Sequence, residues 1–185
     1  MGPIGINKHN VGRVAERIVS NELEYRGFRV SDLNKEGPSA NADLLATRDG
    51  KTWQIQVKGA TEAYDGTWFG YGHCTDAIMA GGKMFNRSTS SFYKAEIVVL
   101  VSVKTAKDYH CLVLPVEIAE KAAQLNLDYA YRTPKRDGGR KKPSIVWVSF
   151  YIPPRMDASK KAQLEKEQEL LKPNLDNWDV LEARL

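Results

Sequence analysis

The sequence lacks the features that define several large protein classes. It has two cysteines in 185 residues, Cys74 and Cys111, which excludes a scaffold built on disulfides. No apolar run approaches the ~20 residues that span a bilayer, and residues 1–10 lack the apolar stretch of a secretory signal. The glycines match neither a P-loop nor a dinucleotide-binding motif. We therefore expect a cytoplasmic protein with reduced thiols and no membrane association.

Neither sign of charge dominates the sequence. Lys and Arg number 27 against 23 for Asp and Glu, which gives a formal net charge of +4. This balance permits a nucleic-acid partner without establishing one. The hydrophobic fraction of 42% and charged fraction of 27% are ordinary for a folded chain. The composition therefore excludes a wholly disordered or low-complexity protein.

Hydrophobic periodicity predicts a sheet flanked by helices. Residues 95–104 are nearly all apolar, which is typical of a central strand buried on both faces. Further strands are predicted at 28–33, 42–47, 52–58, 109–115 and 144–152, helices at 10–26, 75–85, 116–124 and 157–171, and a long loop at 59–73. A leading helix, a run of strands and then alternation favour an α/β or α+β fold.

The stretch from residue 41 to residue 58 carries the chemistry. Asp49-Gly50 is a type I′ turn signal and predicts a β-hairpin. In the register that a two-residue turn imposes, Asp43 faces Gln56, and Lys58 lies on the same side of the sheet. Directly opposed Cβ atoms are ~4.5–5.5 Å apart, so we expect these three side chains to surround one point.

This set of side chains suits a divalent cation and a phosphate. Mg²⁺ prefers oxygen ligands, which here would be the Asp43 carboxylate, the Gln56 amide oxygen and the Val57 carbonyl. Such an ion polarises a phosphodiester and lowers the pKa of bound water. Lys58 would then stabilise the negative charge that develops on the phosphate. The hairpin therefore predicts a minimal phosphodiester-hydrolase site.

These residues resemble the PD-(D/E)XK nuclease superfamily, which includes type II restriction enzymes, archaeal Holliday-junction resolvases and Mrr-type restriction proteins. Glu16 on the first helix, Asp43, and Gln56-Val57-Lys58 follow its pattern over residues 10–60. The resemblance implies an α/β, restriction-endonuclease-like fold with a mixed central β-sheet flanked by helices. It implies Mg²⁺-dependent cleavage of DNA, with Mn²⁺ as a substitute. By position, Glu16 resembles the carboxylate that positions a metal-bound water or a second ion.

The sequence departs from the family pattern at two positions. Ala42 precedes Asp43 where many members have proline, and Gln56 replaces the usual Asp or Glu. A neutral amide still offers one oxygen ligand, but it removes a negative charge from the site. We expect weaker metal binding, and an inactive descendant of the family stays open as an alternative. Asp43 and Lys58 could also be a surface ion pair.

Two further segments are candidates for contact with DNA. One is a basic segment with the residues Arg132, Lys135, Arg136, Arg140, Lys141 and Lys142. The other is the stretch around the aromatic residues Tyr64 and Trp68, followed by His73. A solvated basic loop and an aromatic cluster packed within the protein are the alternatives. The His73-Cys74 and His110-Cys111 pairs lack the spacing of zinc ligands.

The sequence thus predicts a nuclease-like domain at residues 1–155 and a charged C-terminal helix and tail at 156–185, which serves as a dimer contact or docking arm. The expected substrate is double-stranded DNA, and one site per chain favours a homodimer. A nuclease for RNA or branched DNA is one alternative. The other is a catalytically inactive nucleic-acid-binding or assembly protein on the same fold.

Overall fold

The computed structural model describes residues 8–36, 42–62, 67–79, 82–90, 95–105, 107–132, 145–150 and 161–183. No helix in these ranges is long and apolar enough to cross a membrane. The elements are, in chain order, α1 (Lys8–Tyr25), β1 (Arg29–Asp32), η1 (Leu33–Glu36), β2 (Leu44–Arg48), β3 (Lys51–Thr61), β4 (Thr67–Met79), β5 (Gly82–Ser90), β6 (Ile97–Thr105), β7 (Asp108–Pro115), α2 (Val116–Arg132), β8 (Ile145–Phe150), α3 (Lys161–Leu171), η3 (Lys172–Asn174) and α4 (Asp179–Glu182).

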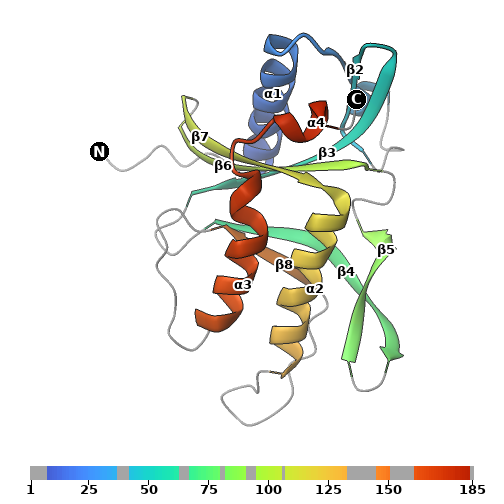
Figure 1. Ribbon diagram of the computed structural model, residues 1–185, viewed down its shortest axis with the longest axis vertical. Coiled ribbons are helices and arrows are strands. Elements are labelled where there is room, and N and C mark those ends of the chain that lie inside the picture. The colour runs from blue at the N-terminus through green and yellow to red at the C-terminus, as the bar shows by residue number, and fades with distance from the viewer. Residues whose placement is uncertain are drawn as a thin grey trace.

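The strands form two sheets. The larger sheet has five strands in the order β1-β2-β3-β6-β7, and the smaller has three in the order β5-β4-β8. In the larger sheet β3 and β6 run parallel, whereas the other neighbouring strands are antiparallel. Helix α1 covers one face of this sheet, and α2 and α3 lie on the other side (Figure 1). The predicted α/β fold with a mixed central sheet flanked by helices is confirmed.

Strand β6 lies at the centre of the hydrophobic core. Every side chain from Ile97 to Val103 is buried, as the apolar run predicts. Ile97 and Val99 face the core beneath α1, whereas Val98 and Leu100 face the core beneath α2. The strand is therefore buried on both faces, and it fixes the position of β3 beside it.

Helix α1 ends as the sequence predicts but begins earlier. Gly27 has φ 82°, its N–H donates to the Glu24 carbonyl (2.9 Å), and the Phe28 N–H donates to the Leu23 carbonyl (3.0 Å). This is the Schellman pattern, in which glycine adopts the left-handed conformation that ends a helix. The start was predicted at Asn10, but the helix begins at Lys8, so Asn10 lies within its first turn.

Two predicted segments are wrong. The proposed loop at 59–73 is mostly strand, because β3 continues to Thr61 beside β6 and β4 begins at Thr67. The proposed helix at 75–85 is a β-hairpin of β4 and β5, in which Met79 pairs with Gly82. Glycine near residue 81 favours chain reversal over a continuous helix, and pairing with distant strands overrides a weak helical pattern.

The second half of the chain follows the predicted order with different boundaries. The helix predicted at 116–124 extends to Arg132, because buried Ala119, Ala123 and Leu127 continue its apolar stripe. After α3, the chain crosses to the α1 side of the sheet, where Trp178 and Leu181 are buried. The C-terminal residues therefore pack against both cores of the same chain, with Leu171 in the other core.

Candidate active site

The β2–β3 hairpin has the predicted register. Arg48 pairs with Lys51 and Leu44 with Ile55, and both turn residues have positive φ, 51° at Asp49 and 78° at Gly50. Positive φ at both central positions is the geometry of a type I′ turn. This register buries one face of the hairpin under α1 and directs Gln56 and Lys58 to the other face.

The candidate site lies where β2 and β3 separate. Regular pairing ends at Leu44 and Ile55, whereas β3 continues to Thr61 and pairs there, among the described strands, with β6 alone. The Asp43 N–H donates to the Ile55 carbonyl (2.8 Å), and the Asp43 carboxylate accepts from the Val57 N–H (2.7 Å). The carboxylate of Asp43 is therefore held by a bond to the β3 backbone, at an edge of β3 that no described strand covers.

Gln56 is buried beside Asp43, with 5% of its surface exposed. Its Nε2 group donates to Oδ2 of Asp43, and it lies 3.5 Å from the carbonyl oxygen of Val57. The positive end of the amide thus lies between two acceptor oxygens. This satisfies a buried polar group, and it brings together the three groups that the sequence assigns as metal ligands.

Lys58 is half-buried next to these oxygens. Burial lowers its pKa, and the carboxylates of Asp43 and Glu16 act in the opposite direction. The two acids therefore offset part of the penalty for holding an ammonium group away from water. The amino group of Lys58 therefore lies in the electrostatic field of two carboxylates.

Glu16 reaches the site because α1 packs unusually close to β3. A Cβ atom on Gly59 would lie 2.6 Å from the Cβ of Ala15 and 2.8 Å from the Val11 carbonyl oxygen. Only glycine permits this approach. The pKa of Glu16 is raised by burial first, and then by the charges of Asp43 and Asp32.

Asn34 is a site residue that the sequence analysis missed. Its Nδ2 group donates to Oδ1 of Asp43 (3.2 Å), and its side chain lies close enough to Glu16 to lower the pKa of that acid. Pairing of β1 with β2 and a bond from the Leu33 N–H to the Asp43 carbonyl (2.9 Å) position it. Asn34 thus lies near both carboxylates, and its hydrogen bond helps to orient that of Asp43.

The donor set fits a hard cation that is held loosely. Within the described ranges, no three His, Cys, Asp or Glu residues are grouped to hold a metal ion. The available donors are instead one carboxylate, on Asp43, and the neutral oxygens of Gln56 and Val57. Rotation of the Gln56 amide by half a turn would place its oxygen beside the other two. Three converging oxygens repel one another when no cation is bound. When Mg²⁺ is bound, they are favourable ligands for it.

The predicted DNA-contact residues stay a prediction, because the structure does not describe their side chains. Trp68 and His73 belong to β4, a strand and not the predicted loop, and their side chains are not described. Arg132 is the last residue of α2, and its side chain is likewise not described. The remaining predicted residues, Tyr64, Lys135, Arg136, Arg140, Lys141 and Lys142, lie outside the described ranges.

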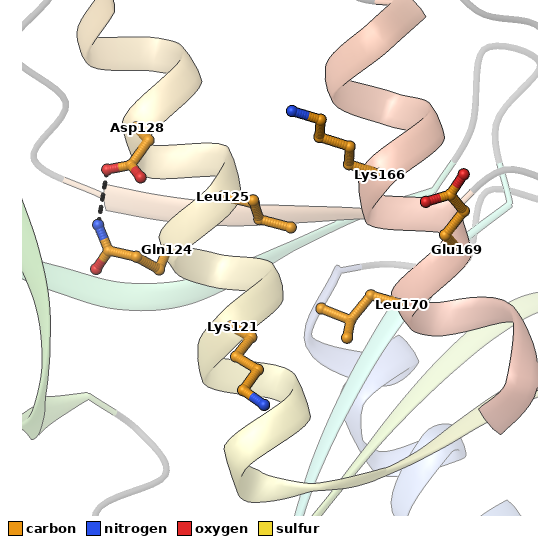
Figure 2. A pocket seen from close by; sticks show the side chains of 7 residues that line it. All are labelled: Lys121, Gln124, Leu125, Asp128, Lys166, Glu169 and Leu170. Carbon is orange, nitrogen blue, oxygen red and sulfur yellow. Dashed lines mark hydrogen bonds between the residues drawn. The ribbon is translucent and has the colours of Figure 1, made fainter.

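A groove between α2 and α3 is the larger of two described pockets, at about 560 Å³ (Figure 2). Leu125 and Leu170 line it together with charged side chains. Gln124 and Asp128 are joined by a hydrogen bond along α2 (2.8 Å). The groove therefore has the character of an ordinary helix–helix surface, and it includes none of the residues of the candidate site.

The fold and site define a mixed-sheet α/β protein with a carboxylate, an amide and a lysine at this edge of β3. No protein-family model and no curated protein matches the chain. Among solved structures, the bacterial homing endonuclease I-Ssp6803I is similar over 88% of this chain and 95% of its own, with 11% identity and a TM-score of 0.49. MepB is similar over 80% and 83%, with 11% identity and a TM-score of 0.35. Both scores are below 0.5, so neither likeness establishes a common fold or activity.

Proposed function

We propose that this protein is a Mg²⁺-dependent endonuclease that hydrolyses DNA phosphodiester bonds. The observation that carries the proposal is the convergence of Asp43, the Gln56 amide and the Val57 carbonyl, with Lys58 in the electrostatic field of Asp43. A structural ion pair would not require a buried amide between two oxygens at this edge of β3. Oxygen donors next to a lysine are the groups that phosphodiester hydrolysis uses.

Each residue has a role that follows from its position. Bound Mg²⁺ would supply positive charge beside the phosphate and make water a better nucleophile. Lys58 stabilises the negative charge that develops on the phosphate oxygens. Glu16 accepts a hydrogen bond from the attacking water, and its pKa is raised by burial first and then by the charge of Asp43. Asn34 keeps the Asp43 carboxylate turned toward the amide of Gln56.

The substrate we propose is double-stranded DNA. The net charge of +4 is compatible with a polyanion, and the PD-(D/E)XK-like pattern of residues favours DNA over RNA. One site per chain and two strands per duplex favour a homodimer in the active complex.

The Gln56 amide also favours a second candidate function, that of a nucleic-acid-binding protein without catalysis. Its Nε2 group occupies the place between two oxygens where a cation would bind. If this orientation is permanent, the site holds no metal and the same surface only binds.

Plasmid cleavage separates the two functions. Wild type, Asp43→Asn and Lys58→Ala are incubated with supercoiled DNA in Mg²⁺, Mn²⁺ or EDTA. Lys107→Ala serves as the control, since this exposed lysine lies in the β6–β7 turn. We expect metal-dependent nicking by wild type and Lys107→Ala and loss of nicking in the two site variants. Binding of plasmid by wild type without cleavage in either metal would support the non-catalytic function.

A further inference from the structure

A second described pocket adjoins the candidate active site. Its volume is about 320 Å³, and the charged residues that line it are Arg13, Glu16, Arg17, Glu24 and Asp32. Glu16 is therefore common to the pocket and to the site of Asp43 and Lys58. A ligand in this pocket would lie beside the bond that we propose is cleaved.

Two arginines on α1 line the pocket. Arg13 and Arg17 are four residues apart, so their side chains project from the same helix face about 6 Å apart along the axis. Both are exposed. Within the described residues neither forms an ion pair, whereas Arg26 pairs with Glu22 and Arg48 with Glu182. Their guanidinium donors are thus available to a ligand.

Three carboxylates, those of Glu16, Glu24 and Asp32, line the pocket together with the two guanidinium groups. The acids would repel a phosphate that approaches the active site, and Arg13 and Arg17 are the lining groups that offset this repulsion. Arg13 is close enough to Glu16 to lower its pKa against the effect of burial. Guanidinium groups match the geometry of phosphate oxygens and bind them through paired hydrogen bonds.

We propose that Arg13 and Arg17 form a phosphate-binding subsite that holds the nucleic-acid backbone beside Glu16. This inference rests on the proposed function, because it assigns the subsite to the substrate of the same active site. The proposed subsite places the DNA contact on α1, whereas the sequence predicted a DNA contact in the basic segment between Arg132 and Lys142. The contact is to the backbone, so it contributes affinity and orientation and no base specificity.

The test is the salt dependence of DNA binding, measured by fluorescence anisotropy with a labelled duplex in EDTA. The variants are Arg13→Gln, Arg17→Gln and the double variant. The control is a second double variant, Arg29→Gln combined with Lys107→Gln. It removes the same number of positive charges as the pocket double variant, but from exposed positions outside the pocket. Substitution of either pocket arginine should reduce the magnitude of the slope of log K against log salt by about 1. The double variant should bind at least roughly tenfold more weakly at low salt, and the control should keep the wild-type slope.

Several outcomes separate this inference from the proposed function. If wild type cleaves and the double variant keeps the wild-type slope, the subsite is refuted and the nuclease stands. If wild type never cleaves but the slope falls, the subsite stands and the nuclease is refuted. Titration calorimetry with inorganic phosphate completes the test. Phosphate binding that the double variant loses, with no change in the slope for DNA, would assign the pocket to free phosphate and overturn the proposal.

Discussion

Substitution of Gly59 by alanine should separate α1 from β3 and disturb the site without touching any proposed catalytic group. The new Cβ atom would lie 2.6 Å from the Cβ of Ala15 and 2.8 Å from the carbonyl oxygen of Val11. Neither neighbour is the end of a flexible side chain, so relief requires movement of the helix. Overpacking of this kind destabilises by about 1–3 kcal/mol, a large share of the ~5–15 kcal/mol that stabilises a typical domain.

Gly12 on the same helix provides a matched control. A Cβ atom there would meet no atom within 4 Å, and alanine in a helix is favoured over glycine by about 0.5–1 kcal/mol. Urea unfolding should therefore show opposite changes in the free energy of unfolding for Gly59→Ala and Gly12→Ala. Folded Gly59→Ala should also cleave more slowly, because Glu16 follows α1. Equal stability of both variants, with full cleavage by Gly59→Ala, would refute the close approach of α1 as the device that positions Glu16.

Three further predictions concern the site and its support. Gln56→Glu should bind Mg²⁺ more tightly and be roughly 1–3 kcal/mol less stable in EDTA, because a second buried carboxylate would then lie directly beside that of Asp43. Unfolding with and without Mg²⁺ measures both effects. The Tyr109 hydroxyl donates to Glu22 (2.7 Å), which raises the pKa of Tyr109 to about 12. The folded pKa exceeds the unfolded value of about 10, so this stabilisation is complete below pH 10 and is lost by about pH 12. Tyr109→Phe should therefore be about 1–2 kcal/mol less stable at pH 8, with the difference vanishing toward pH 12 in urea unfolding. Trp178→Ala should lose roughly 3–5 kcal/mol, whereas Tyr25→Ala, at a side chain 90% exposed, should change stability by less than about 0.5 kcal/mol in the same assay.

The hairpin and the central strand were predictable because their signals are local. Asp49-Gly50 specifies the turn, and the turn specifies the register of the two strands. That register brings Gln56 close to Asp43. The apolar run of β6 required no knowledge of its partners. Features of this kind depend on residues close in the sequence, and the structure confirms them.

The features that the sequence did not predict depend on contacts between segments that are distant in the chain. Asn34 comes near Asp43 only through the pairing of β1 with β2, and no motif marks that register. The β4 strand was mistaken for a loop because its pairing with β8 joins residues about 80 positions apart, such as Thr67 with Phe150. Alternation of aromatic and glycine residues in β4 was a period-two signal, but glycine favoured the interpretation as a loop.

The central claim is that Asp43, Gln56 and Lys58 form a metal-dependent hydrolase site. It is tested most directly by the first-order rate at which excess protein converts supercoiled plasmid, measured across Mg²⁺ concentration for wild type, Asp43→Asn and Lys58→Ala. We predict a wild-type rate that rises with Mg²⁺, reaches a plateau and is abolished by EDTA. Both variants should lose at least about 100-fold in rate while still binding the plasmid. A wild-type rate in EDTA, or wild-type rates in both variants, would contradict the account.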